Sequence, residues 1–297
     1  MSVLDKGTRY SFECIPHKAS QWETSEMKLK LMQWYQLPPC TNTAHYHGRN
    51  LDQHGGVKRF RMRGKFDPAN DAAFLRAFFE SKSVRANLPF PATMPASLDD
   101  LSFRKLKTNV SSMAFFDKLE ACPDIVSCGG MLRRCMDDVV DDCTVNDNLR
   151  DMLVNPHSDH ASSLFSSSEQ DEAIFQIFKR LAIGGAMAQH DDTLQPYLDC
   201  TKQVYKALLS VHKATLSHHH HSENAADPLA KTQIGVRTSL YMVHTGERDS
   251  NQQEIVVSNA TRQLFPKPNS PFNACFVAVD PHTFSVLCWY VPFVPFW

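Results

Sequence analysis

The sequence lacks the short motifs by which many enzymes hold phosphate groups or activate a nucleophile. It contains no G-x-S-x-G elbow, no P-loop and no G-x-G-x-x-G stretch. The Gly184-Gly185 pair lies inside a helical pattern, where each glycine costs about 1 kcal/mol relative to alanine. That pair favours a helix break or a close-packing point over a ligand loop. We therefore expect a protein without catalytic residues, without a cofactor and without a resident metal.

An excess of charge and a long apolar run are also missing. Lys and Arg number 31 against 32 Asp and Glu, so no overall field attracts nucleic acid or an anionic membrane. The longest apolar run, residues 286–297, contains two prolines and falls short of the about 20 residues of a membrane span. Residues 1–10 contain three charged side chains and no apolar stretch of a secretory signal. We expect a cytosolic protein without a membrane span.

Closely spaced metal ligands are scarce. The nine cysteines are an odd number, so reduced thiols are expected rather than a disulfide framework. Structural zinc sites usually join tight C-x₂₋₄-C pairs, and no pair here has that spacing. The run 218–221 consists of four histidines, which would bind a divalent ion only weakly in an exposed loop. The histidines and cysteines that come nearest to a cluster are His45, His47, His54, Cys122, Cys128, Cys135 and Cys143.

An acidic run is present at residues 137–142. If this segment is helical, as we expect for 131–140, Asp137 with Asp141 and Asp138 with Asp142 lie one turn apart and can hold Mg²⁺. The spacing resembles the aspartate-rich motif of prenyl-diphosphate synthases. Those enzymes carry a second acidic motif and are nearly all helical, so the favoured interpretation is a solvated helix face.

A basic stretch at residues 58–66 interleaves Lys and Arg with apolar residues, among them Phe60 and Phe66. The pattern predicts a strand over 58–63. Its cations are compatible with a nucleic-acid face, but protection of an exposed strand edge explains them better.

The aromatic C-terminal tail, residues 289–297, is unusual for a chain end. Its aromatic rings need to be shielded from water. We expect them to fold back on their own domain, with the anchor of a partner interface as the alternative.

Helices and strands follow one another in an α+β order. Alternation and β-branched residues predict strands at 10–15 and 237–244, and a C-terminal β-hairpin of 274–280 and 283–290. Residues 103–116 are expected to be extended. Helices are expected at 25–35, after Asp67-Pro68, and at 131–140 and 147–154.

A helical hairpin occupies the centre of the sequence. Ser166 and Glu169 form a capping box before an apolar helix face that runs from Ile174 to Leu181. Thr193 is expected to cap a second helix with Pro196 in its first turn. One stripe of that helix should then hold Tyr197, Thr201, Val204, Tyr205, Leu208 and His212.

These elements predict one globular domain, residues 1–297, with the helical hairpin packed on a mixed or antiparallel sheet. Polar composition without periodicity predicts two mobile insertions, 213–230 and 247–271, and several prolines predict a linker near 87–100.

Several segments resemble, in the same order, the cilia- and flagella-associated protein 300 family. The most specific are the two halves of the helical hairpin, F-K-R-L-A-I-G-G-A-M-A-Q-H-D-D at 178–192 and P-Y-L-D-C-T-K-Q-V-Y-K-A-L-L-S-V at 196–211. Weaker blocks lie at 10–35, at 112–116 and at 276–281. The histidine run, the insertion 247–271 and the aromatic tail depart from the family pattern.

The resemblance implies a non-catalytic interaction protein in the cytoplasm and the axoneme of cilia or flagella. It would serve the assembly or intraflagellar transport of outer and inner dynein arms, on which ciliary motility depends. The implied partners are other dynein-arm assembly factors and intraflagellar transport proteins. The alternative function is a Mg²⁺-dependent enzyme acting on a phosphate or diphosphate compound through the acidic cluster 137–142.

Overall fold

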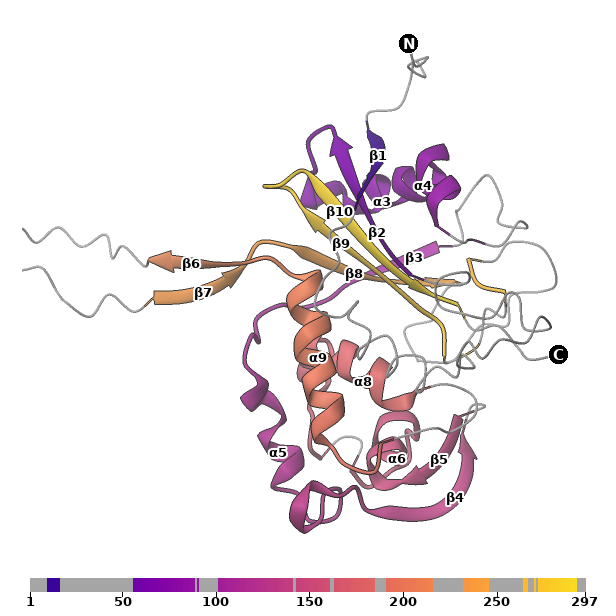
Figure 1. Ribbon diagram of the computed structural model, residues 1–297, viewed down its shortest axis with the longest axis vertical. Coiled ribbons are helices and arrows are strands. Elements are labelled where there is room, and N and C mark those ends of the chain that lie inside the picture. The colour runs from indigo at the N-terminus through magenta and orange to yellow at the C-terminus, as the bar shows by residue number, and fades with distance from the viewer. Residues whose placement is uncertain are drawn as a thin grey trace, which may run out of the picture.

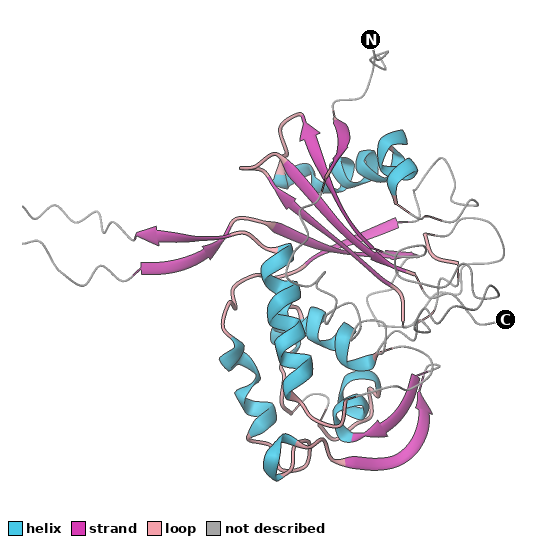
Figure 2. Ribbon diagram, viewed as in Figure 1, coloured by secondary structure: helices cyan, strands magenta, loops and turns pink. Residues whose placement is uncertain are grey.

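A computed structural model describes residues 10–16, 56–88, 90, 101–140, 143–160, 163–184, 191–215, 232–245, 264–266, 270 and 272–292. The fold is α+β, as the sequence predicts, and has three layers (Figures 1 and 2). A twisted antiparallel sheet lies in the middle, two short helices cover one face, and a larger helical layer covers the other. No helix in these ranges is long and apolar enough to cross a membrane.

The central sheet has six strands in the order β1-β2-β10-β9-β8-β3. All its pairings are antiparallel. The predicted C-terminal hairpin is confirmed, and it occupies the middle of the sheet rather than an edge. The strand bounds are β1 Ser11–Ile15, β2 Gly56–Arg63, β3 Leu101–Lys105, β8 Ser239–Thr245, β9 Ala274–Asp280 and β10 Ser285–Val291.

The smaller helical layer consists of η2 (Pro68–Asn70), α3 (Asp71–Glu80) and α4 (Lys82–Asn87). Asp67 accepts a hydrogen bond from the Ala69 amide at 3.0 Å and so starts the predicted helix. Its aromatic face packs edge-to-face on the strands; the rings of Phe78 and Phe60 lie 5.3 Å apart. This core takes alternate residues of each strand, including Met62, Tyr241, Val277, Val286 and Cys288.

The larger layer is built around the predicted helical hairpin, α8 (Ala173–Ile183) and α9 (Gln195–Leu208). The Ser166–Glu169 capping box is confirmed, but it starts the single turn α7 (Ser167–Gln170) that precedes α8. Thr193 is not the cap of α9; Leu194 holds that position without a side-chain hydrogen bond. The remaining elements are η3 (Met113–Phe116), α5 (Asp117–Glu120), η4 (Cys128–Gly130) and α6 (Asn148–Val154).

The opposite set of strand residues faces this larger layer. Leu240, Phe276, Leu287 and Trp289 join the core formed by α6, α8 and α9. The stripe predicted on α9 is buried from Tyr197 to Leu208. His212 lies beyond the helix, because the chain turns at Leu209 and enters a strand.

Two small hairpins extend from the body. The hairpin of β6 (Val211–Thr215) and β7 (Thr232–Val236) projects sideways (Figure 1). The other consists of β4 (Arg134–Val140) and β5 (Cys143–Asp147). The predicted helix over 131–140 is therefore wrong, and the extended prediction for 103–116 holds only to Lys105, since Met113–Phe116 is a 3-10 helix.

Several predicted loops contribute to the core where the structure describes them. Leu264 and Phe265, inside the insertion 247–271, are buried, and Phe265 stacks on Tyr290. Phe90, in the linker 87–100, packs edge-to-face on Tyr290. Trp289 and Tyr290 are covered by their own domain. Residues 25–35, 218–221 and 293–297 lie outside the described residues, and the expected domain organisation stays a prediction.

Candidate interaction surface

The β4–β5 hairpin carries the two most exposed large apolar side chains of the described residues. Met136 is 89% and Val139 66% exposed, while most large apolar side chains are in the two cores. Asp137 and Asp138 lie between them and are exposed as well. We call these four residues the β4 surface. Large exposed apolar groups on an otherwise well-packed protein mark contact sites.

The backbone of β4 has an open edge. Among the described strands, β4 pairs only with β5, in the order β4-β5. The register shifts between Arg134 and Asp138, and such a bulge bends and twists a strand. Unpaired N–H and C=O groups along an open edge can accept a strand from another chain. The β4 surface therefore joins exposed apolar side chains to an available hydrogen-bonding edge.

The hairpin is anchored through β5 and the start of α6. Cys143, Val145 and Asp147 alternate inward along β5. Asp147 caps α6 by accepting a hydrogen bond from the Arg150 amide at 2.9 Å, and its carboxylate pairs with the Arg150 guanidinium. The exposed strand is thus attached to a rigid base.

Arg150 extends this anchor to α9. Its guanidinium donates to the Tyr197 hydroxyl at 2.8 Å, and that hydroxyl accepts from the Asp191 amide at 2.8 Å. Burial lowers the pKa of Arg150 and raises the pKa of Tyr197, because each loses the solvation of its charged form. At neutral pH Arg150 remains a cation, paired inside the protein.

The aspartates of the acidic run do not share a helix face. Asp137 and Asp138 are neighbours on a strand, where successive side chains point to opposite faces. Asp138 accepts a hydrogen bond from the Val139 amide at 2.7 Å. Asp141 and Asp142 lie outside the described residues. The geometric premise of the Mg²⁺ site, carboxylates one helical turn apart, is wrong.

Cys135 on β4 is partly buried and lies near several carboxylates. Burial, followed by the charges of Asp151, Asp137 and Asp138, raises the pKa of its thiol. The thiol therefore stays protonated at neutral pH, which disfavours a role as nucleophile.

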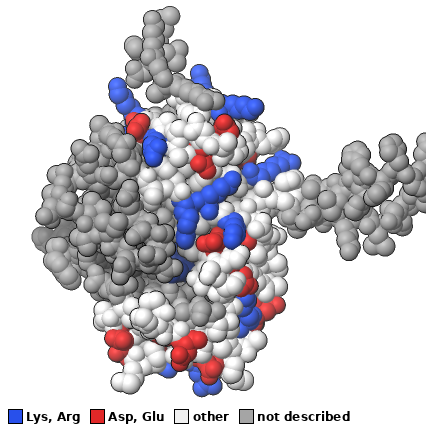
Figure 3. Space-filling view, turned by 180° about the vertical axis from the view of Figure 1, so that it is seen from behind, with Lys and Arg blue, Asp and Glu red and all other residues white. Residues whose placement is uncertain are grey.

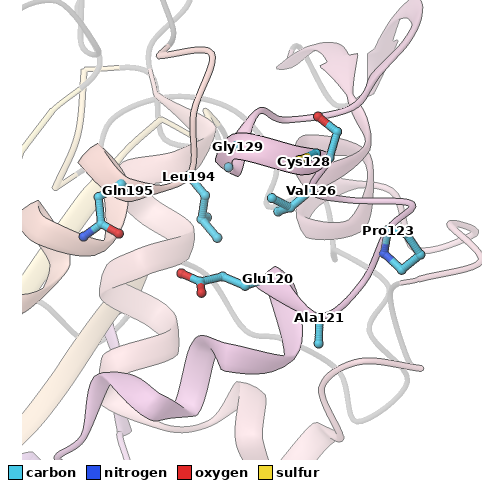
Figure 4. A pocket seen from close by; sticks show the side chains of 10 residues that line it. Glu120, Ala121, Pro123, Val126, Cys128, Gly129, Leu194 and Gln195 are labelled. Carbon is cyan, nitrogen blue, oxygen red and sulfur yellow. The ribbon is translucent and has the colours of Figure 1, made fainter.

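A shallow pocket of about 430 Å³ lies between the end of α5, η4 and the start of α9. Glu120 on α5 extends its carboxylate into this space, facing Leu194 at the start of α9 (Figure 4). Gly129 and Gly130 form one wall in left-handed conformations, with φ of 83° and 78°. Of the side chains that line the pocket, Glu120 is the only titratable carboxylate, so the lining offers no paired acid and base.

The basic strand is not an edge. β2 is hydrogen-bonded on both sides, to β1 and to β10, so the expected edge protection is wrong. Arg61 makes an exposed ion pair with Glu13 of β1 at 3.9 Å. In Figure 3 the Lys and Arg side chains gather over the upper half of the visible face and acidic ones are more frequent at its lower end.

Of the histidines and cysteines considered from the sequence, the structure describes four cysteines. Cys122, Cys128 and Cys135 are at least partly exposed and Cys143 is buried, all as free thiols. His45, His47 and His54 lie outside the described residues.

Sequence reasoning missed the β4 surface because it took the acidic run as helical. One local signal favoured a strand: Val139 and Val140 precede Thr144 and Val145, and β-branched residues are enriched in strands.

The comparisons with known proteins place the chain in a family. The model of "Cilia- and flagella-associated protein 300" matches residues 9–291. A protein of that name from Chlamydomonas reinhardtii is 31% identical over 193 residues, which are 65% of this chain and 65% of that protein. One from Paramecium tetraurelia is 30% identical over 158 residues, 53% of this chain and 62% of that protein.

The chain thus spans slightly less than two thirds of the length of these relatives. No solved structure is significantly similar to it. The family model covers nearly the whole chain, and its match agrees with the ordered blocks seen in the sequence. The chain belongs to the cilia- and flagella-associated protein 300 family.

Proposed function

We propose that this protein is a non-catalytic interaction factor that helps to assemble outer and inner dynein arms or to deliver them into the cilium. A ciliary or flagellar role follows from the family to which the chain belongs. The step of arm assembly or transport is the finer part of the proposal.

The observation that carries the proposal is the β4 surface. An open strand edge with Met136 and Val139 exposed suits β-augmentation, in which a partner adds an extended segment. The backbone supplies the hydrogen bonds and the two apolar side chains supply buried area. Asp137 and Asp138 favour a segment that carries Lys or Arg beside its apolar residues. We infer that this segment belongs to a dynein-arm subunit or an assembly factor.

The test replaces both apolar side chains by acids. Met136→Asp with Val139→Asp adds charge where a partner would bury apolar surface, but both positions are exposed, so the fold is expected to persist. In a flagellated organism that lacks its own copy of the gene, this variant should fail to restore swimming. Isolated axonemes should be depleted of outer- and inner-arm dynein chains.

The matched control is Val211→Asp on β6, where Val211 is 56% exposed. It introduces one carboxylate, against two in the double variant, at an exposed apolar position outside the β4 surface, and it should restore motility. Full motility with the double variant, at normal protein level, would overturn the role of the β4 surface.

Cell fractions distinguish the two steps. If the double variant leaves dynein chains accumulated in the cell body, the protein acts in delivery. If the chains also disappear from the cell body, it acts in assembly. Gene deletion that leaves motile cilia with all arms would overturn the proposed function itself.

A further inference from the structure

Three potential metal ligands from two separate segments converge beside α6. The Cys122 sulfur, an Asp124 carboxylate oxygen and a His160 ring nitrogen all lie within 4.8 Å of one another. The first two residues follow α5 and the third follows α6. Local sequence spacing gives no hint of this group, because His160 is distant in sequence from the other two.

Both segments are held in place by hydrogen bonds from the backbone and side chains around them. Asn148, the first residue of α6, donates from its side chain to the Asp124 carbonyl at 2.7 Å. The Cys122 carbonyl accepts from the Val126 amide at 2.9 Å. Ser163 donates to the His160 carbonyl at 3.3 Å. The three side chains therefore start from fixed backbone positions, as a binding site requires.

The three side chains differ in how far they are buried. Cys122 is partly buried and packs against the larger core, His160 is also partly buried, and Asp124 is exposed. A soft sulfur ligand thus lies on the inner side and a carboxylate at the solvent side, which leaves an open path for an ion and a water ligand.

We propose that Cys122, Asp124 and His160 form a zinc site with water in the fourth position. Thiolate, carboxylate and imidazole are the three side-chain ligand types of Zn²⁺, and three protein ligands with one open position are common. The charges of a thiolate and a carboxylate balance the dication. Bond lengths of about 2.0–2.3 Å put tetrahedral ligand atoms about 3.3–3.8 Å apart, so even a pair of ligand atoms at the 4.8 Å limit can reach an ion by small side-chain rotations.

Bound zinc would join the segments at the two ends of α6. Arg133, just before β4, donates to the Pro123 carbonyl at 3.1 Å, so the ion also stiffens the base of the β4–β5 hairpin. This inference does not depend on the identity of the partner or on a role in dynein-arm assembly.

Co²⁺ provides the test, because a thiolate bound to Co²⁺ gives an intense near-ultraviolet charge-transfer band. The starting protein carries His218→Asn, His219→Asn, His220→Asn and His221→Asn, which removes the histidine run as a competing site. Titration should give the band with one equivalent of Co²⁺, and Zn²⁺ should abolish it. Affinity should fall as pH is lowered, because the ligands must lose their protons.

Variants assign the ligands. Cys122→Ser should abolish the band, and Asp124→Asn or His160→Gln should weaken binding by more than the roughly 10–100-fold typical of outer-shell changes. Cys128→Ser and His157→Gln are matched controls at exposed positions nearby, and they should bind as the starting protein does. Absence of the band, or a band that survives Cys122→Ser, would overturn the site.

A second measurement needs no substitution of the proposed ligands. In the starting protein, Zn²⁺ should slow alkylation of Cys122 by iodoacetamide, mapped by mass spectrometry, and leave Cys128 unchanged. Equal alkylation of Cys122 with and without Zn²⁺ would contradict the proposal.

Discussion

At the scale of single residues, Glu169 shows how one side chain secures the start of the larger helical layer. Its carboxylate accepts hydrogen bonds from the Lys118 ammonium at 2.6 Å and from the Ser166 amide at 2.9 Å. These two interactions lower the pKa of Glu169 to about 2. A folded-state pKa below the unfolded value stabilises the protein above the unfolded pKa, and the gain is lost as pH falls through the folded one.

Glu169→Gln removes the charge, whereas an amide can still take the capping-box position. We expect the variant to be less stable by about 1 kcal/mol at neutral pH, since solvent screens a pair of this exposure. The difference should shrink as pH falls from about 4.5 towards 2, the interval of the shift. Urea unfolding at a series of pH values checks this. Glu80→Gln, an exposed change on α3, should show no such trend, and a constant difference for Glu169→Gln would refute the ion-pair account.

At the scale of elements, Arg150 joins α6, β5 and α9. It is 1% exposed, and its partners are Asp147 and Tyr197. Arg150→Met should destabilise the protein by about 3–5 kcal/mol, because the buried Asp147 carboxylate loses its counter-charge. Denaturant unfolding measures the loss.

Adding Asp147→Asn to that variant should recover much of the stability. Asparagine is neutral and can still cap α6, so no unpaired charge remains buried. Arg76→Met, an exposed change on α3, should stay within about 0.5 kcal/mol of the wild type. A double variant no more stable than Arg150→Met would show that packing, not charge, dominates at this position.

The sequence was sufficient to predict those helices and strands whose periodic pattern lies within one segment. The apolar face of α8, the stripe of α9 and the alternation of β9 and β10 each lie within one segment. It failed where pairing is distant: residues 213–215 of β6, expected in a mobile insertion, pair with β7 beyond the histidine run. The strand β2 was predicted correctly, but it was expected at an edge because its partner β10 comes from a distant part of the sequence. The same limit hid the convergence of Cys122 with His160, and reading the acidic run as a helix hid the β4 surface.

At the scale of the whole molecule, two cores share one sheet. Phe78 is fully buried on one face and Phe178 on the other. Strands whose alternate residues enter both cores couple them, so the described body should unfold as one unit. Phe78→Ala and Phe178→Ala should each cost about 3–5 kcal/mol and shift the same transition.

Coincident unfolding curves by circular dichroism and tryptophan fluorescence check this coupling. Phe284→Asn serves as the control, because Phe284 is exposed and has a φ of 51°, which asparagine tolerates better. That variant should be as stable as the wild type. Two separate transitions in either core variant would indicate that the layers unfold independently.

Because β9 and β10 lie in the middle of the sheet, the sheet cannot be completed before both strands have been translated. β1 and β2 emerge early from the ribosome, and β3 and β8 follow, but the two groups share no direct pairing. Their connection, β9–β10, is translated after all four of these strands. A premature stop codon after residue 245 would leave two strand pairs with no bridge between them. We therefore expect a truncation after residue 245 to prevent completion of the sheet, and the edges of β2 and β8 to stay unpaired on the nascent chain until β9 and β10 have left the ribosome.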